Sequence, residues 1–474
     1  TELEIKYTPN EKNYITNLFI FKNNPNKTTN NLLFNADAIN QNTNTENYTI
    51  YNHFNHTLQL TEKTVLNNYF YLGNDKINEK TNIVSPVLNN FLSINLNEIV
   101  NQNANNKLFF IGNKSKIISK FKKIDLTNTI QLEYSKEQFK NTFLGNNQSF
   151  ASYQNNTNLH LTNLFQENTL RYNFSKKIDL TANLNFQNTI FNNNNISKNI
   201  FFVNPSIFLN IKKTGFGNFS LSFSENNTLP EINQLTTNYQ LTDYRSFLQG
   251  TSYQNPLKNQ TSSFNYSYYN DAKRFSINSS VFYTNSKFIF NTSSNLTNDF
   301  NFNSYIQTKG SESYNFNFSF VNYIRKLKLA SKIETLNNWI TTPINVNSTD
   351  FSNSKSYINS IKYSATTYFK APINFDFGFS YNYFQSYFQG IKTANITKDY
   401  FLNINYKISQ TILAESNNAL YLVNNQTYSF NNIVLSYTPK ESKFSYRFMF
   451  NNLINENQYT YILINNYSYY QSNI

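Results

Sequence analysis

The sequence predicts an all-β protein, a transmembrane antiparallel β-barrel of about 20–22 strands. Three observations predict this fold class. Apolar and polar residues alternate along most of the chain, short basic turns interrupt the alternation, and no apolar run approaches the ~18–20 residues of a membrane helix. Composition agrees with it: aromatic residues make up 17% of the chain while mean hydropathy is −0.56. Only every second residue of a barrel strand faces lipid.

Composition also excludes other classes. The chain has 474 residues, a formal charge of +13, 45 Phe, 36 Tyr and no Cys. Soluble domains of this length would need buried partners for the many Asn residues that separate the rings, and disordered chains are poor in aromatics. Absence of Cys excludes disulfide scaffolds and thiolate metal sites. Because the chain begins with Thr1 and no leader, we expect a mature product or a fragment.

The alternation is clearest from Ile373 to Tyr383, where every odd position is apolar or aromatic and polar residues or Gly separate them. Such a strand has one apolar and one polar face. Its length is close to the ~9–11 residues with which a tilted strand crosses a bilayer, whereas strands of soluble sheets average ~5–6. The same pattern recurs in four further segments: Ile178–Phe186, Phe219–Phe223, Tyr314–Phe320 and Leu402–Tyr406.

Short polar turns, most of them basic, separate pairs of alternating runs. They are expected at Pro9–Lys12, Thr61–Lys63, Lys120–Lys123, Ser175–Lys177, Lys212–Gly215, Asp271–Lys273, Tyr323–Lys326, Ala371–Pro372, Ser409–Gln410 and Pro439–Ser442. Long stretches rich in Asn, Ser and Thr lie between them, such as Asn226–Gln260 and Thr341–Ser354, and Gln458–Gln471 is predicted to be one more strand. Outer-membrane barrels have this arrangement, with short periplasmic turns and long extracellular loops.

The physical reason for a barrel is the backbone. In lipid every N–H and C=O must be paired internally, and a sheet achieves this only when it has no free edge. The Phe and Tyr faces would then contact acyl chains, while Asn, Ser and Thr would line an interior filled by water or a plug domain. The basic residues form no aromatic-interleaved groove, so no nucleic-acid partner is expected. Genomes rich in A and T also raise Lys and Asn, which explains part of the charge without function.

Four stretches of the C-terminal half resemble a known family. "SENNTLPEINQLTTNY" (Ser224–Tyr239) is similar to a strand end and outer loop, and "FLQGTSYQNPLKNQTSSFNYSY" (Phe247–Tyr268) to a GNP-x-L-x-P-E loop that has Gln254 in place of Gly. "SYIQTKGSESYNFNFSF" (Ser304–Phe320) resembles a strand with an N-x-G core, and "YTPKESKFSYRFMFNNLINENQY" (Tyr437–Tyr459) the closing NNL hairpin. In this order they resemble the barrel of Bacteroidetes-type TonB-dependent receptors.

This resemblance implies an outer-membrane location in a Gram-negative bacterium and import of a nutrient such as a siderophore, oligosaccharide or peptide. Members carry a plug domain before the barrel, through which a TonB-type protein supplies energy, and a final strand that ends in an aromatic residue. The chain shows neither feature. Residues 1–474 are therefore expected to be an incomplete outer-membrane barrel domain without its plug. Implied partners are outer-membrane lipid, the nutrient, the TonB-type protein and, as a further candidate, a surface lipoprotein.

No residue pattern indicates catalysis. Nucleophile elbows, P-loops and zinc or calcium motifs are absent from the sequence. His53 and His56 would face opposite sides of a strand and so form no metal pair. The carboxylates Glu225 and Asp243 are better explained as supports of loop structure. We expect no enzyme activity, no catalytic residue, no metal and no cofactor.

Ligand recognition is expected in the loop Asn226–Gln260, at the mouth of the barrel. The predicted ligand-binding residues are Tyr239, Tyr244, Arg245 and Tyr253, whose rings and polar groups would stack on and hydrogen-bond a sugar, chelate or peptide. The alternative for the tyrosines is packing within the loop or at the membrane interface. Trp339, the single Trp, is expected to be an interfacial anchor.

The predicted function is thus the barrel of a TonB-dependent receptor. A passive porin or secretion channel is the first alternative, and an extracellular Asn-rich adhesin or fibre-forming β protein is the second. Dependence on detergent separates the adhesin from both membrane proteins, and ion conductance separates the porin from the receptor.

Overall fold

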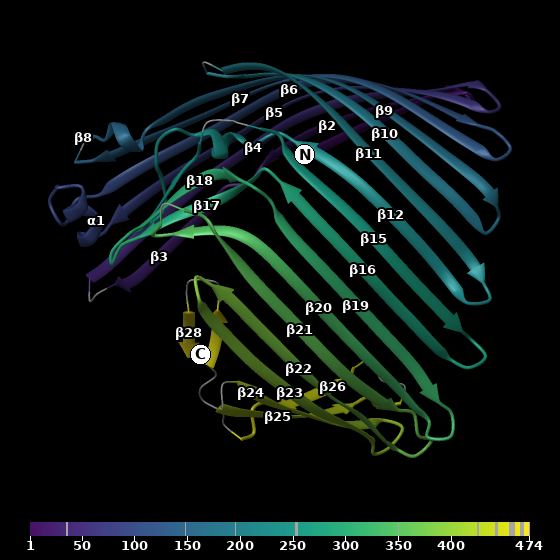
Figure 1. Cartoon of the computed structure of the whole chain (residues 1–474). Coiled ribbons are helices and arrows are strands. Elements are labelled where there is room, and N and C mark those ends of the chain that lie inside the picture. Colours follow the sequence, from purple (N-terminus) through teal and green to yellow (C-terminus); the bar gives the residue numbers. More distant parts are fainter. Residues whose placement is uncertain are drawn as a thin grey trace.

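The computed structural model of the chain is almost entirely β-structure (Figure 1). It describes residues 1–34, 37–146, 148–194, 196–251, 255–348, 350–423, 426–440, 444–454, 460–464 and 469–473. These residues form one 26-stranded sheet and a separate two-stranded sheet. None of the helices in those ranges has the length and apolar character needed to cross a membrane.

Most strands of the large sheet form one antiparallel meander, in which each strand pairs with the next. Its order is β1 (Glu2–Asn10), β2 (Asn13–Asn23), β4 (Asp37–Thr61), β5 (Thr64–Val84), β6 (Val100–Lys120), β7 (Ile124–Gly145), β9 (Asn155–Ser175), β10 (Ile178–Asn193), β11 (Ile196–Thr214), β12 (Gly217–Thr228), β15 (Leu257–Asn270), β16 (Phe275–Lys287), β19 (Ser311–Ile324), β20 (Leu329–Val346), β21 (Ser352–Thr367), β22 (Ile373–Phe388), β23 (Ile391–Lys407), β24 (Ile412–Val423), β25 (Gln426–Tyr437) and β26 (Tyr446–Phe450).

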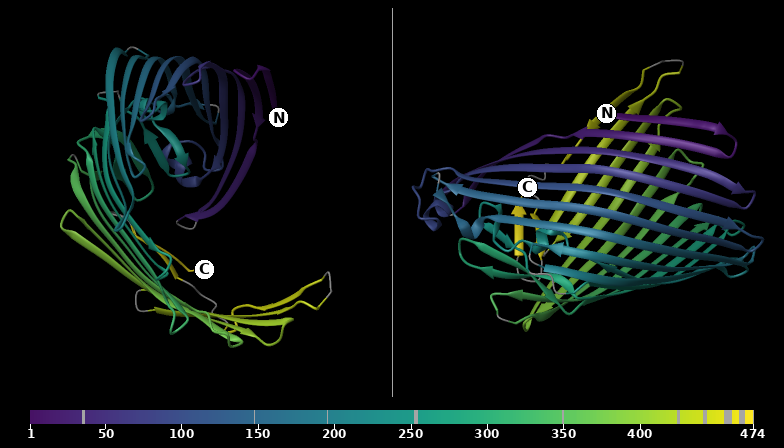
Figure 2. Two further views of the ribbon diagram at one scale, coloured as in Figure 1. Left: turned by 90° about the vertical axis from the view of Figure 1, so that its right-hand side faces the viewer. Right: turned by 90° about the horizontal axis from the view of Figure 1, so that it is seen from above.

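The predicted turns separate these strands, and their described residues lie at one edge of the sheet, called here the turn end; Glu441 and Ser442 of the last predicted turn lie outside the described residues. The opposite edge, called the loop end, carries the longer connections (Figure 1). The sheet curves strongly through its N-terminal strands and more gently through β19 to β25 (Figure 2). The curved antiparallel meander confirms the predicted fold class, because the alternating segments are strands with an exposed apolar face.

The outer face of the sheet carries a band of apolar side chains next to the turn end, called here the apolar band. Strand β7 shows how far this band extends along a strand. Its even positions point outward, and Leu126, Ile130 and Leu132 are 42%, 51% and 56% exposed. Beyond Tyr134 the same face changes to Lys136, Gln138 and Lys140. The strand thus has about eleven residues of apolar outer face next to the turn, enough to cross a bilayer when tilted, and a further polar part beyond it.

Asparagine side chains on the apolar face pair with one another across strands. The Asn359 amide donates to Asn337 Oδ1 at 2.6 Å, and the Asn431 amide donates to Asn418 Oδ1 at 2.7 Å. Asn418 in turn donates to the backbone carbonyl of Leu402 at 2.8 Å. Such cross-strand bonds satisfy polar groups that would otherwise be costly in hydrocarbon. An Asn-rich strand is therefore compatible with a lipid-facing surface.

The long N-terminal strands β4, β5, β6, β7 and β9, of 21 to 25 residues, extend past the apolar band and support a layer of folded loops. Figure 2 shows this layer within the curve of the sheet. Its elements are β3 (Asn26–Phe34), α1 (Pro86–Phe91), β8 (Gln148–Ser149), η1 (Ala151–Tyr153), η2 (Ile232–Leu235), β13 (Gln240–Asp243), β14 (Ser246–Gln249), β17 (Ile289–Leu296) and β18 (Asn301–Thr308).

Three sequence predictions differ from the structure. Gln458–Gln471 is not one strand of the meander: its described residues belong to β27 (Thr460–Ile464) and β28 (Tyr469–Asn473), which pair with each other. Tyr461 to Ile464 are consecutive apolar residues, so they lack the period of two that marks a barrel strand. Thr341–Ser354 is mostly strand, because β20 and β21 continue to pair as far as Ile344 and Ser352. The loop after β12 is also shorter than predicted, since Asn226–Thr228 pair with Leu257–Asn259.

Candidate functional site: the folded loop layer

Three of the four predicted ligand-binding residues lie in the loop layer, Tyr244 and Arg245 on one ring and Tyr239 on another. Tyr244 packs edge-on against the Phe34 ring, with 6.0 Å between centroids. The Arg245 guanidinium lies over the same ring, 4.5 Å from its centroid. Tyr239 packs edge-on against Phe302 at 5.5 Å. All three side chains are half-buried, and Tyr253 lies outside the described residues.

The turn between β13 and β14 is held by Asp243. Its Oδ1 accepts the backbone N–H of Arg245 at 2.9 Å, which is the structural role expected for this carboxylate. The Arg245 carbonyl accepts the N–H of Asn301 at 2.9 Å and so joins this hairpin to β18. Because both bonds are to backbone, the Arg245 side chain is positioned over Phe34 by the turn itself.

Below these residues is an aromatic core centred on Phe247, which is completely buried. The ring of Phe302 stacks on it with 5.0 Å between centroids and 6° between planes, and Tyr153 lies 5.1 Å away. The wider cluster comprises Ile83, Leu88, Leu92, Val100, Phe143, Leu241, Phe247 and Phe300. Residues from the strands and from several loops thus share one core, so the loop layer is ordered by packing.

Two amide side chains on the inner face of the sheet fix the backbone of the long loop. Gln102 donates to the carbonyl of Leu241 at 2.6 Å and accepts its N–H at 2.9 Å. Asn155 does the same for Asn238, at 3.0 Å and 2.9 Å. Each side-chain amide satisfies both the N–H and the C=O of one loop residue, as a neighbouring strand would. The loop is therefore anchored on both sides of Tyr239 and ahead of Tyr244.

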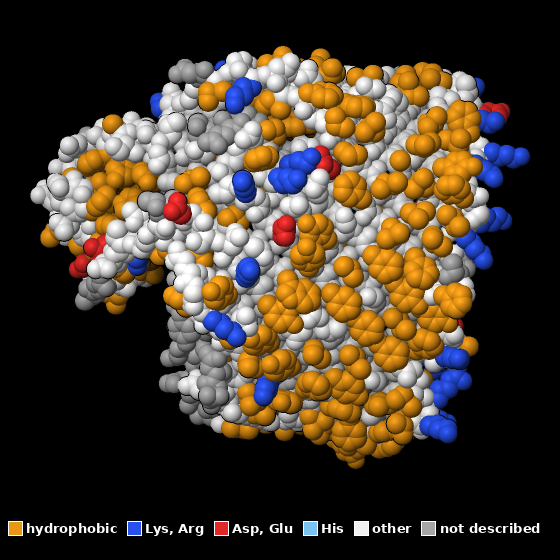
Figure 3. Space-filling model, in the orientation of Figure 1, with side chains coloured by type: hydrophobic (Ala, Val, Ile, Leu, Met, Phe, Trp, Pro, Cys, Tyr) orange, Lys and Arg blue, Asp and Glu red, His pale blue; other side chains and the backbone are white. Residues whose placement is uncertain are grey.

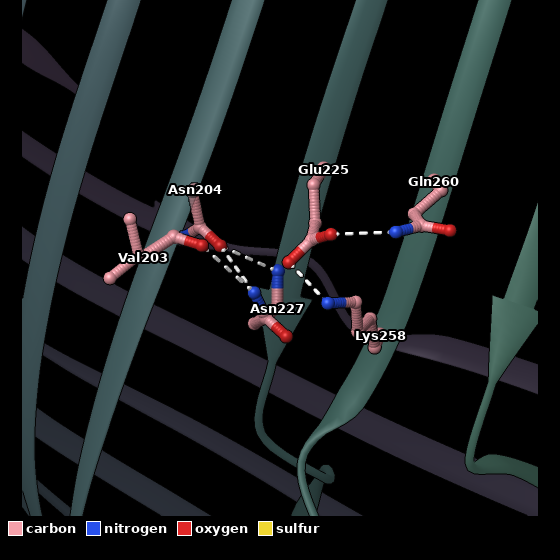
Figure 4. Close-up of polar contacts among 6 residues, drawn as sticks. All are labelled: Val203, Asn204, Glu225, Asn227, Lys258 and Gln260. Atoms are coloured by element: carbon pink, nitrogen blue, oxygen red, sulfur yellow. Dashed lines mark hydrogen bonds and ion pairs between the residues drawn. The ribbon is translucent and has the colours of Figure 1, made fainter.

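The base of this loop is held by a polar network across β11, β12 and β15 (Figure 4). Lys258 Nζ lies 2.5 Å from Glu225 Oε1, and the Gln260 amide donates to Glu225 Oε2 at 2.7 Å. Asn227 donates through its backbone N–H and its side-chain amide to Asn204 Oδ1, both at 2.8 Å. The Glu225 carboxylate thus stabilises the departure of the loop from the sheet.

A second set of residues lines an open cavity of about 710 Å³ beside the aromatic core. Its polar groups include Asp37, Asp299 and Asn90, and its apolar wall includes Phe91, Phe300 and Phe302. Phe91 and Phe300 are 4.7 Å apart, so aromatic faces and carboxylates border one space. Sequence reasoning missed this cavity because its residues come from three connections far apart in the chain. No local spacing indicates that these connections meet.

Electrostatics near η2 are set by two carboxylates. Burial raises the pKa of the Glu137 carboxyl, a hydrogen bond from Asn106 at 2.8 Å opposes the rise, and the negative charge of Glu231 adds to it. Glu231 is the N-terminal cap of η2, and its backbone N–H donates to Gln234 Oε1 at 3.0 Å. The cap residue of η2 thus contributes to the raised pKa of Glu137.

The inner wall carries a tyrosine patch on β4 to β7. Tyr51 and Tyr69 are hydrogen-bonded through their hydroxyls, and Tyr71 donates to Glu133. The Tyr71 ring occupies the space where a side chain of Gly112 would be, since a Cβ atom there would lie 2.4 Å from it. His53 joins this patch, with its ring 5.0 Å from Tyr69. His56, three residues on, contacts Asn13 at 3.2 Å instead.

The apolar outer band, the polar inner wall and the loop layer together define the wall of a transmembrane barrel. The sequence matches no family model and no curated protein. Among solved structures, the copper transporter OprC matches with a TM-score of 0.53 at 7% identity, over 90% of this chain and 66% of that one. At this identity the match shows the fold alone: the chain has the antiparallel β-barrel fold that the sequence predicts.

Two further matches have lower TM-scores. The siderophore receptor PirA from Acinetobacter baumannii matches at 0.41 and 8% identity, over 88% of this chain and 75% of that one. The FrpB iron transporter from Neisseria meningitidis matches at 0.46 and 13% identity, over 90% of this chain and 77% of that one. The chain thus spans two thirds to four fifths of the length of the structures that it resembles.

Proposed function

We propose that this chain is the barrel of an outer-membrane receptor of the TonB-dependent kind, which imports a nutrient into a Gram-negative cell. The observation that carries the proposal is the division of the long strands. In β7 about eleven residues next to the turn have an apolar outer face, and the long strands extend beyond this level to support a folded aromatic layer at the opposite end. A passive channel needs the first part, whereas the ordered layer suits capture of a ligand.

In this proposal the ligand contacts the exposed parts of Tyr239, Tyr244 and Arg245 and the cavity beside Phe91. Aromatic faces next to hydroxyls, carboxylates and a guanidinium suit a polar ligand with flat or ring-shaped parts, such as a siderophore, an oligosaccharide or a peptide. The import step itself needs no covalent chemistry. Energy from a TonB-type protein, through a plug, and a surface lipoprotein remain proposed partners.

The test keeps the loop folded while removing its polar groups. In the triple variant Tyr239→Phe, Tyr244→Phe, Arg245→Gln, the rings that pack on Phe34 and Phe302 are retained. Binding of ferric siderophores, Cu²⁺ salts, oligosaccharides and short peptides is measured on the protein in vesicles. We expect the triple variant to lose at least tenfold in affinity for the ligand that the wild type binds, with unchanged insertion.

The matched control is Tyr283→Phe, which removes a hydroxyl from the outer face of β16, away from the loop layer, and should leave binding unchanged. Unchanged binding by the triple variant would reject this loop as the ligand site. A steady ion conductance without binding of any probe would instead favour the passive channel. Full solubility without detergent would contradict both the receptor and the passive channel, and would leave the extracellular adhesin as the proposed function.

A further inference from the structure

The turn end carries a large excess of positive charge. Figure 3 shows Lys and Arg side chains along this edge of the sheet. The acidic residues in its described turns and beside them are Glu11, Glu62, Asp125, Asp179 and Asp271. The basic residues with described side chains are Lys12, Lys63, Lys120, Lys122, Lys123, Lys176, Lys177, Lys212, Lys273, Arg274, Arg325, Lys326, Lys328, Lys370, Lys407 and Lys440. The basic residues of this edge thus outnumber the acidic ones about threefold, and their excess accounts for most of the formal charge of the whole chain, +13.

The loop ends of the same strands are mixed in charge. Glu79 precedes Lys80 on β5, and Lys136 precedes Glu137 on β7. A genome-wide drift towards Lys codons would raise positive charge at both ends of a strand, because it has no relation to the direction of the chain in space. The difference between the ends therefore needs a reason that acts on the turn end alone.

Four neighbouring turns bring the lysines together. Backbone bonds join one turn to the next: Lys120 N to Lys63 O at 2.8 Å, Asn173 N to Lys123 O at 2.8 Å, and Lys212 N to Lys177 O at 2.6 Å. We call the exposed lysines of the first three of these turns the lysine patch. It consists of Lys63, Lys120, Lys122, Lys123, Lys176 and Lys177.

The salt bridges found among the described residues include none of the six lysines of the lysine patch, although Asp125 lies opposite Lys120 in the register of β6 and β7. The adjacent Lys212 differs, because its Nζ lies 2.9 Å from Asp179 on the inner wall. Six like charges on adjacent turns repel one another, so an external anion would relieve the repulsion.

Exposed aromatic residues lie at the same level. Phe121 is 54% exposed between Lys120 and Lys122, Phe174 is 50% exposed beside the next turn, and Phe216 is 79% exposed in the turn after β11. Aromatic rings that flank an apolar band mark the headgroup region of a bilayer. The lysine patch therefore lies where lipid phosphates would be, continuous with the apolar band.

We infer that the lysine patch binds the phosphates of anionic phospholipids in the leaflet that the turns face. The charge of the patch complements such headgroups, and basic side chains near a bilayer surface contribute about 1 kcal/mol each to attraction of anionic lipid, a factor of about five. The inference relies on the proposed membrane insertion but adds a lipid class and a leaflet. The basic edge would also fix the direction in which the barrel crosses the membrane.

The test uses the full chain in vesicles of equal parts phosphatidylcholine and phosphatidylglycerol. After mild detergent extraction, the lipids retained by the protein are quantified by mass spectrometry. We expect phosphatidylglycerol to be enriched about fivefold over phosphatidylcholine. The variant Lys122→Gln, Lys123→Gln, Lys176→Gln, Lys177→Gln should lower this ratio to near one, and so should 1 M NaCl, because salt screens exposed charges.

The control variant removes the same charge from the loop end, at Lys80, Lys107, Lys140 and Lys392, each to Gln, and should retain the enrichment. Equal ratios in the two variants would overturn the inference, as would full displacement of phosphatidylglycerol by millimolar inorganic phosphate. Should the fourfold variant fail to insert, the pairs Lys122/Lys123 and Lys176/Lys177 are replaced separately, and each should reduce the enrichment. A wild type that does not insert contradicts the proposed function, whereas insertion without enrichment contradicts only this inference.

Discussion

At the turn end, neighbouring strands are joined by a few exposed residues, whereas at the loop end the same strands extend past the apolar band into a layer with its own aromatic core. Phe121 at the turn end is half exposed, while Phe247 at the loop end is completely buried. One end therefore depends on backbone pairing and the surrounding bilayer, and the other on side-chain packing. The same substitution should have very different effects at the two ends.

The largest effect is expected from Phe247→Ala. It removes the ring against which Phe302 and Tyr153 pack, and loss of a buried Phe costs about 3–5 kcal/mol. The loop layer should open while the sheet stays paired. Hydrogen exchange in vesicles should show at least a hundredfold loss of protection in β13 and β14, with the amides of β21 and β22 unchanged.

The matched change at the turn end is Phe121→Ala, which leaves no cavity because the ring is exposed. Its effect on protection of the loop layer should be below the detection limit. Equal loss of protection in both variants would contradict the division of the molecule into two independently stabilised ends.

A smaller effect is expected from Gly250→Ala in the loop layer. A Cβ atom at this buried position would lie 2.5 Å from Thr236 N and 2.6 Å from Gln234 O, both backbone atoms that cannot turn aside. Forcing such a contact costs about 1–3 kcal/mol. At the turn end, a Cβ on Gly215 would meet no atom within 4 Å, so Gly215→Ala should be tolerated. Urea-dependent proteolysis of the loop layer would show the difference as a lower midpoint for Gly250→Ala alone.

The difference between the ends also explains which features were predictable from sequence. The strands and turns were predictable, because alternation such as that of Ile373–Tyr383 is a local pattern that a lipid-facing strand requires at every second residue. Tyr239, Tyr244 and Arg245 were expected together because they lie in one loop. The cavity lined by Asp37, Phe91 and Phe300 was not predictable, since it depends on three connections that meet only in the folded structure. The packing of Tyr244 on Phe34 was hidden for the same reason.

The smallest predicted effect is a pH dependence of hydrogen exchange. Only the loop layer should show it, so it distinguishes the loop end from the turn end. The pKa of Glu137 is raised in the folded protein, chiefly by burial. A carboxyl that binds its proton more tightly in the docked state stabilises docking at low pH. This stability is lost as pH rises from the ordinary carboxyl range through the raised pKa. Exchange of the η2 amides, corrected for their intrinsic pH dependence, should therefore accelerate over that interval.

Three variants dissect this pH dependence. Glu137→Gln should abolish it, because no proton is then released. Glu231→Gln should reduce it, since the neighbouring negative charge contributes to the rise, and Asn106→Ala should enlarge it by removing the bond that favours the charged form. Persistence of the full pH dependence in Glu137→Gln would assign it to another group. If instead hydrogen exchange of the turn-end amides showed the same pH dependence, the two ends would unfold as one cooperative unit. This result would contradict the claim that side-chain packing stabilises one end and backbone pairing the other.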